Sequence, residues 1–157
     1  MRKENQKKII SIDMSEGSME NISPEQRQER AIAIYDLLEK NSFSLVKIPG
    51  PYKLILSKET RHLLFDIRSE NNLNLNSFYF AMGPFRKLIR DYNQVCESYY
   101  DAIRTKPPSQ IEAIDMGRRA LHNEGAELVI ERLYGKIDLD NDTARRLFTL
   151  ICILQNS

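Results

Sequence analysis

The sequence predicts an α+β fold, in which an antiparallel β-meander of about four to five strands is packed on one face by about four helices. Three patterns lead to this prediction. Apolar residues alternate with a period of two between residues 43 and 82, whereas from Pro84 onward they recur every three or four residues. Short connections join the extended segments, which favours antiparallel pairing.

The chain of 157 residues is long enough for one domain with a substantial core. We expect residues 1–6 to form a disordered tail and residues 7–157 to form a single globular domain. Hydrophobic residues make up 41% and charged residues 29% of the chain, which is ordinary for a globular protein. The 23 basic and 22 acidic side chains nearly balance, so nucleic-acid binding through a basic surface is not indicated.

No segment is typical of export or of membrane insertion. The basic start lacks the apolar run of a signal peptide, and the longest apolar stretch, at 147–154, is too short to span a bilayer. The two cysteines, Cys96 and Cys152, cannot form a disulfide framework. We therefore expect a cytoplasmic protein with no membrane partner.

The N-terminal elements are predicted from their end signals. The segment KIISIDM at 8–14 is short and rich in β-branched residues, as expected of a strand. Ser23, Pro24 and Gln26 form a capping box that begins a helix, and Asn41 is placed to end it. The expected apolar side of this helix comprises Ala31, Ile34, Leu37 and Leu38.

Four strands are expected next, followed by three helices. The strands are FSLVKI at 43–48, YKLILS at 52–57, HLLFDIR at 62–68 and SFYFAM at 77–82. The first of the three helices covers 84–106 and is stopped by the two prolines at 107–108. Ser109 and Glu112 then form a capping box for the next helix, which Gly135 ends, and the last helix starts within 138–142.

The apolar face of the helix expected over 111–135 contains Arg118, with Asp115 and His122 at its edge. An unpaired buried guanidinium is very costly, so Arg118 must be paired, exposed in a cleft or placed at an interface. Three interpretations stay open: a structural ion pair with Asp115, a site for an anionic ligand, and a subunit interface. The candidate ligand-binding residues are Asp115, Arg118, Arg119, His122, Asn123 and Glu124.

Two further features of these helices have two interpretations each. Tyr92 and Tyr99 lie on an apolar stripe, where they either pack in the core or form the wall of a pocket that faces Arg118. Gly125 lies on the apolar face of the next helix. Either the helix is interrupted there and offers N–H groups to an anion, or it is continuous and the glycine permits a close helix approach.

The last helix is apolar nearly all round, so it is either central to the core or covered by another subunit. Phe148, Ile151 and Leu154 are the candidate interface residues, with Arg145 and Arg146 at the rim of the contact. On this basis we expect a homo-oligomer, most simply a twofold dimer.

No catalytic or metal-binding residue is predicted. The segment DLDND at 138–142 resembles the opening of a calcium loop, but Thr143 and Thr149 replace the glycine and glutamate that such a loop requires. The chain has no nucleophile motif, and Gly135 and Lys136 lack the rest of a phosphate loop. We expect no cofactor, and whether the protein is an enzyme stays open.

Several long blocks resemble an uncharacterised protein family of alphaproteobacteria, UPF 0262. They are RAIAIYDLLEKNSF, PFRKLIRDYNQVCESYYDAIRT, PSQIEAIDMGRRALHNEGAELVIERL and DTARRLFTLICIL. The resemblance extends from about Ile9 onward and is weakest at residues 58–77. It implies a small bacterial cytoplasmic protein and transfers no catalytic residue.

Three functions are compatible with the sequence. We favour a regulatory or protein-interaction protein, acting as a homo-oligomer or on a protein partner, because catalytic motifs are missing and the last helix has surplus apolar surface. The alternative is a binding protein or enzyme for an anionic ligand, with Arg118 as a clamp and His122 as an acid or base. The second alternative is RNA or ribosome contact through Arg86, Lys87, Arg90, Arg145 and Arg146.

Overall fold

The computed structural model describes residues 6–14 and 22–156. The predicted disordered tail lies outside the described residues except for Gln6, whose carbonyl accepts a hydrogen bond from the N–H of Gly50 (2.8 Å). The strands are β1 (Ile9–Met14), β2 (Phe43–Leu45), β3 (Tyr52–Lys58), β4 (His62–Arg68), β5 (Asn74–Ala81) and β6 (Ile137–Leu139). The α-helices are α1 (Pro24–Glu39), α2 (Arg86–Thr105), α3 (Pro108–Leu133) and α4 (Asn141–Asn156), and a short 3-10 helix, η2, spans Gly83–Phe85.

The predicted α+β class is confirmed, with a four-stranded mixed sheet ordered β1-β3-β4-β5 and a separate two-stranded sheet. Strands β3, β4 and β5 form the predicted antiparallel meander, in which Leu54 pairs with Ile67 and Leu63 with Phe80. The apolar residues that alternate along β3 and β4 are all buried: Tyr52, Leu54, Leu56, Leu63, Phe65 and Ile67. This face of the sheet therefore forms one wall of the core.

Two parts of the predicted meander are wrong. Strand β1 pairs with β3 in parallel, with Ile12 opposite Leu54, because α1 lies between them in the chain and supplies the long connection that parallel pairing requires. The segment 43–48 does not join the main sheet; β2 pairs instead with β6, Phe43 opposite Leu139. Strand β6 spans only Ile137–Leu139, too few residues to give an alternating pattern.

A buried side chain, Asn41, joins α1 to the edge of the main sheet. Its Oδ1 accepts a hydrogen bond from the N–H of Ile9 (2.8 Å), and its Nδ2 donates to the carbonyls of Ile9 (3.0 Å) and Leu37 (2.8 Å). Helix α1 ends at Glu39, so Asn41 follows the helix as predicted and also caps an open strand edge.

The capping box predicted for α1 is confirmed. Ser23 Oγ accepts from the N–H of Gln26 (3.1 Å), and Gln26 Oε1 accepts from the N–H of Ser23 (3.2 Å). The predicted apolar side is partly wrong, because Ala31 and Leu38 are exposed whereas Ala33 and Leu37 are buried. The segment AIAIYDLL is apolar on both sides, so its periodicity did not select one face.

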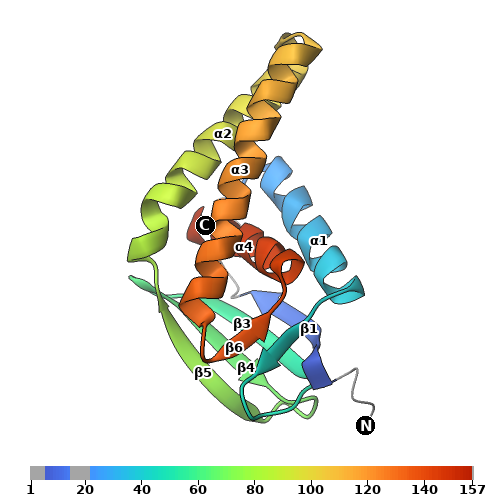
Figure 1. Ribbon diagram of the computed structural model, residues 1–157, viewed down its shortest axis with the longest axis vertical. Coiled ribbons are helices and arrows are strands. Elements are labelled where there is room, and N and C mark those ends of the chain that lie inside the picture. The colour runs from blue at the N-terminus through green and yellow to red at the C-terminus, as the bar shows by residue number, and fades with distance from the viewer. Residues whose placement is uncertain (1–5, 15–21, 157) are drawn as a thin grey trace.

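Helices α2 and α3 run together as a long hairpin that rises away from the sheet, with α1 beside it and α4 at its base (Figure 1). The two prolines end α2 as predicted, but α3 begins at Pro108 with Pro107 as its N-cap, so the capping box expected at Ser109 did not form. Gly135 follows α3 with a φ of 85°, as expected of a residue that ends a helix.

Helix α4 is central to the core rather than covered by another subunit. It contacts α1, α3 and β3. Phe148, Ile151 and Leu154, the candidate interface residues, are all 0% exposed within the single chain. Because these side chains are buried in the single chain, they cannot form a contact with a second subunit. The homo-oligomer stays a prediction, and its interface would have to use another surface.

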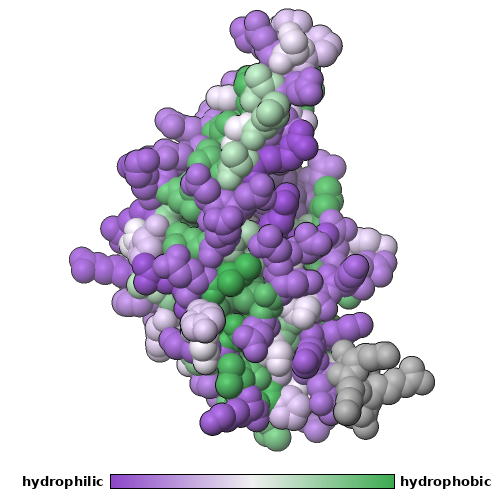
Figure 2. Space-filling model, viewed as in Figure 1, coloured by the Kyte–Doolittle hydropathy of each residue, from purple (hydrophilic) through white to green (hydrophobic). Residues whose placement is uncertain are grey.

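Most of the surface in view is hydrophilic, with apolar patches along the hairpin and over the lower body (Figure 2). Ile103 of α2 and Met116 of α3 are among the exposed large apolar side chains. Within the described ranges, no helix is both long and apolar enough to cross a membrane.

Helix α3 packs closely against Phe148 of α4 at Gly125. A Cβ atom at this buried position would overlap the ring of Phe148, so only glycine fits unless the ring or one of the helices shifts. Helix α3 is continuous there, which decides between the two interpretations of Gly125 in favour of close packing. The ring of Phe148 also lies edge-on to Tyr92 (5.6 Å between centroids) and to His122 (5.7 Å).

We predict that Gly125→Ala destabilises the fold by about 1–3 kcal/mol, because the added methyl group would push α3 away from α4. Gly117→Ala is the matched control, since it lies on the same helix and its added Cβ would meet only Val95 at 3.8 Å. That variant should be neutral or stabilised by roughly 1 kcal/mol through helix propensity. Urea unfolding measures both, and equal effects of the two substitutions would contradict the close approach.

Candidate functional site

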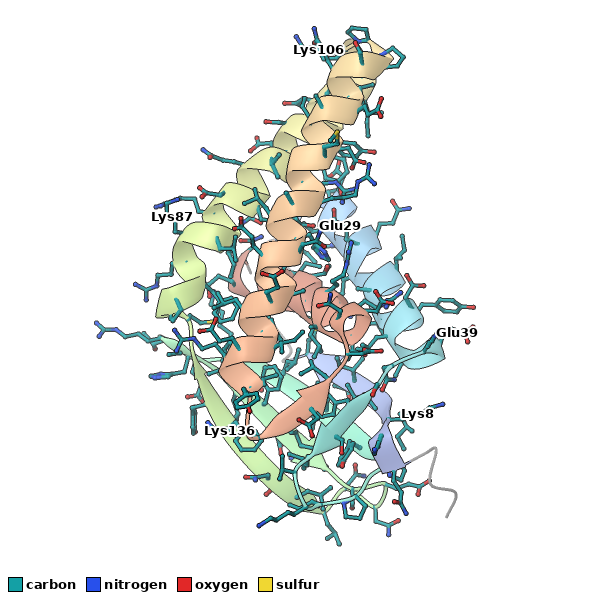
Figure 3. All side chains as sticks on the ribbon, in the orientation of Figure 1. Lys8, Glu29, Glu39, Lys87, Lys106 and Lys136 are labelled. Carbon is teal, nitrogen blue, oxygen red and sulfur yellow. The ribbon has the colours of Figure 1, made fainter. Side chains whose placement is uncertain are left out.

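A pocket of about 350 Å³ lies between α1, α3 and α4, with Tyr92 of α2 in its wall. We call it the arginine pocket. Its lining comprises Glu29, Ile32, Ala33, Asp36, Tyr92, Arg118, Arg119, His122, Arg145, Arg146 and Thr149. A larger hollow of about 510 Å³ adjoins it, shares Glu29 and Tyr92 with it, and is lined mostly by acidic and neutral side chains. Figure 3 shows Glu29 on the side of α1 that faces the hairpin.

The helical spacing of the residues brings the positive charges together. Arg118 and His122 are one turn apart on α3, and Arg145 and Thr149 are one turn apart on α4. The contact at Gly125, one turn beyond His122, sets these two faces against each other. Four guanidinium groups from two helices therefore line one pocket.

On α3, both arginines are held by a single carboxylate. Asp115 Oδ1 accepts from Arg118 Nη2 (2.6 Å) and Nε (3.0 Å), and Asp115 Oδ2 lies 2.9 Å from Arg119 Nη2. Arg118 also lies over the ring of Tyr99, 4.9 Å from its centroid. The Arg118 hydrogen bond holds the pKa of Asp115 below its usual value. One negative charge thus orients two positive ones and neutralises only one of them.

On α4, the two arginines are held by neutral oxygen atoms. Arg145 Nη1 donates to Asn123 Oδ1 (2.7 Å), and Arg146 Nη1 donates to the carbonyl of Asp142 (3.2 Å). A guanidinium has five N–H donors, so each keeps several for a ligand. The four guanidiniums outnumber the three carboxylates at or behind the pocket, those of Glu29, Asp36 and Asp115.

His122 is part-buried and uncharged at neutral pH. Its Nε2 lies 2.8 Å from Thr149 Oγ1, and that oxygen lies 3.3 Å from the carbonyl of Arg145. The hydrogen bond to Thr149 holds the imidazole against α4. Burial, and then the charges of Arg145 and Arg118, lower the pKa of His122 to about 4.

The structure separates the sequence-predicted site residues into three groups. Arg118, Arg119, His122 and Tyr92 line the arginine pocket. Asp115, Asn123 and Tyr99 lie behind it and position its arginines. Glu124 is exposed on α3 and does not line the pocket. The structural ion pair and the pocket therefore coexist, and the ion pair lies within α3 instead of tying it to another element.

The sequence missed the other half of the site. Arg145 and Arg146 were expected at the rim of a dimer contact, and Thr149 was noted only as a misfit to a calcium loop. A signal was present, because these three are the polar residues of an otherwise apolar stretch, ARRLFTLICIL at 144–154, and lie on one side of it. Glu29 and Asp36 gave no signal, since charged residues on a helix usually face solvent.

The five basic residues proposed for RNA contact do not form one cluster. Arg86 and Arg90 border a hollow next to Gln155 and Asn156, near the end of α4. Arg145 and Arg146 lie near its start, and ten residues of helix separate Arg145 from Gln155, about 15 Å along the axis. This separation weakens the RNA hypothesis.

The arrangement offers anion binding rather than a reactive nucleophile. Burial raises the pKa of Cys96 to about 11, and burial together with the Glu29 charge raises the pKa of Tyr92 above its usual value. Neither group is therefore ionised at neutral pH. In the part of the chain that the structure describes, no group of three or more His, Cys, Asp or Glu side chains could hold a metal ion.

Comparison with known proteins agrees with the resemblance seen in the sequence. A family model described as "Uncharacterised protein family (UPF0262)" matches residues 6–157. The chain belongs to this family. The UPF0262 protein of Ruegeria pomeroyi is 50% identical to it over 153 residues, covering 94% of this chain and 95% of that protein. The Rhodospirillum rubrum relative is 51% identical over 146 residues, covering 93% of this chain and 91% of its own.

No solved structure matches the chain. The UPF0262 relatives carry no activity in their names. The geometry of the arginine pocket is therefore the basis for a functional proposal.

We predict that the protein loses stability as the pH falls from about 6.5 to about 4, because unfolding lets His122 take up a proton that the folded state excludes. The sign follows from the lowered pKa: the unfolded chain binds more protons in this window, so acid favours unfolding. The loss is up to about 3 kcal/mol.

His122→Gln should flatten this dependence between pH 6.5 and 5, measured by urea unfolding at each pH. His62→Gln, which removes an exposed ring on β4, is the control and should leave the dependence in place. If wild type and His122→Gln lose stability in parallel, the imidazole is not excluded from protonation.

Proposed function

We propose that the protein binds a small anionic ligand in the arginine pocket. One observation carries the proposal: four guanidinium groups from α3 and α4 line the same pocket of about 350 Å³. Such a volume is at the lower end of the range for small-molecule sites. Guanidinium groups are suited to carboxylates and phosphates because they offer charge and paired N–H donors together.

The way in which the arginines are held supports binding over a purely structural role. Arg118 and Arg119 share Asp115, which fixes their side chains before a ligand arrives. Arg145 is held by Asn123, an exposed neutral side chain that leaves its charge uncompensated. Side chains that are fixed in advance lose less conformational entropy on binding.

His122 would couple binding to protonation. An anion placed beside the imidazole opposes the effects of Arg145 and Arg118 that lower its pKa. Binding would then raise the pKa of His122, and by linkage the ligand would bind more tightly as the pH falls toward 5. The pocket therefore supports a binding protein whose affinity depends on pH.

The outer surface of α1 favours a second candidate function, which is self-association into a homodimer. Tyr35 and Leu38 are 64% and 41% exposed and border a hollow of about 480 Å³ with Ala31 and Ile34. Sedimentation equilibrium tests this candidate: wild type should dimerise and Leu38→Glu should be a folded monomer. A monomeric wild type at high micromolar concentration would rule out this candidate.

We predict that inorganic phosphate raises the thermal stability of the wild type relative to chloride at matched ionic strength. A ligand present at a hundred times its dissociation constant adds about 2.7 kcal/mol. Arg145→Gln should weaken binding by roughly tenfold to a hundredfold, because it removes charge-assisted hydrogen bonds from the pocket.

Arg86→Gln is the matched control, since it removes an exposed arginine from the start of α2, outside the arginine pocket. It should keep the full response to phosphate. The proposed function is wrong if phosphate has no effect beyond that of chloride, or if both arginine variants lose the response equally.

A further inference from the structure

The wall of the arginine pocket opposite the arginines carries two carboxylates. Glu29 and Asp36 of α1 both line the pocket. They are seven residues apart, two helical turns, and so project from the same face of α1. Carboxylates on the wall of a pocket repel a simple anion. These two side chains therefore indicate that the ligand also carries a hydrogen-bond donor or a positive charge.

The two carboxylates differ in their partners. Glu29 accepts a hydrogen bond from the hydroxyl of Tyr100 on α2, which fixes it between the two helices. Asp36 is half-buried, and among the residues that the structure describes no hydrogen bond or ion pair reaches its carboxylate. Asp36 is therefore an acceptor without a donor inside a pocket that is otherwise rich in donors.

The position of Asp36 along α1 argues against a role in stability. Helix α1 ends at Glu39, so Asp36 lies in its last turn, and that turn contains no basic residue. A negative charge near a helix C-terminus is unfavourable because the carbonyl ends of the backbone dipoles point there. Asp36 therefore destabilises the end of its own helix without a compensating partner in the protein. A hydrogen-bond donor on the ligand would supply that compensation.

We propose that the ligand is a hydroxyl-bearing phosphate ester, whose phosphate binds the arginines and whose hydroxyl groups donate to Asp36. The inference rests on the proposed function, since it names the ligand class of the same pocket. A phosphate carries up to two negative charges and three acceptor oxygens, which suits several guanidiniums at once.

The donor that Asp36 receives is a hydroxyl rather than an ammonium group. Arg119, Arg145 and Arg146 line the same small pocket, and their charges oppose a cation placed beside them. A hydroxyl donates a hydrogen bond without adding positive charge. The carbon skeleton between the two polar ends would lie against Ile32 and Ala33 of α1.

Calorimetric titration of the full-length protein with two probes tests the inference. Ribose 5-phosphate carries phosphate and hydroxyl groups, and methyl phosphate carries the phosphate alone. Wild type should bind ribose 5-phosphate about tenfold more tightly than methyl phosphate, because hydrogen bonds to a charged acceptor are strong. Asp36→Asn should remove most of this preference while it leaves methyl phosphate binding unchanged or slightly tighter.

Glu39→Gln is the matched control variant. It removes a carboxylate from the same last turn of α1 but outside the pocket, where Glu39 accepts a hydrogen bond from Tyr35. It should keep the preference for ribose 5-phosphate. Because Asp36 is unpartnered at a helix C-terminus, Asp36→Asn should fold at least as stably as wild type, so a lost preference will not reflect unfolding.

The outcomes separate this inference from the proposed function. Equal affinity of wild type for both probes, or a preference that survives Asp36→Asn, overturns the assignment of Asp36 and leaves the anion site intact. Tighter binding of phosphoethanolamine than of ribose 5-phosphate overturns the choice of a hydroxyl over an ammonium group. Failure of both phosphate probes to bind overturns the anion site itself and this inference with it.

Discussion

The contact between Gly125 of α3 and the ring of Phe148 on α4 is the constraint on which the rest of the structure depends. Any side chain larger than hydrogen at position 125 would overlap the Phe148 ring, so the ring or one of the helices would have to move. The ring of Phe148 is in turn fixed by Tyr92 and His122, so three helices meet around one aromatic side chain. One turn before the contact on α3 is His122, and one turn before Phe148 on α4 is the backbone that carries Arg145. The packing that closes the core therefore also assembles the arginine pocket.

Helix α4 serves the core and the site at once. Leu147, Phe148, Leu150 and Ile151 are fully buried, whereas Arg145 and Arg146, which precede them, and Thr149, which lies among them, line the pocket. Thr149 lies on this polar side of α4, and its hydroxyl is the hydrogen-bond partner of His122 Nε2. The position of Thr149 therefore fixes the position of the imidazole. The packing of α4 also explains the low pKa of the imidazole, since the same packing that orients the ring removes it from water and places Arg145 beside it. The burial of His122 and its proximity to the charge of Arg145 thus both result from the packing of α3 against α4.

The sequence predicted the α+β class, the β3–β4–β5 meander, the helix boundaries near 24, 107 and 135, and half of the arginine pocket. These features have local signals: alternation in the strands, the capping box at Ser23, the two prolines and the charge at Arg118 within an apolar face. Parallel pairing of β1, the partnership of β2 with β6 and the burial of α4 depend on contacts between distant segments, for which a single sequence has no pattern. Asp36 was beyond prediction for the same reason, because an acidic residue on a helix faces solvent unless another helix lies opposite.

The most direct test of an anion site between α3 and α4 is an NMR titration of the arginine side-chain N–H signals with inorganic phosphate at constant ionic strength. We expect saturable shifts, with one common dissociation constant, for Arg118, Arg119, Arg145 and Arg146, and only weak, non-saturating shifts for Arg86 and Arg90. Equal, non-saturating shifts for all six arginines would show general charge screening and would contradict an assembled anion site between α3 and α4.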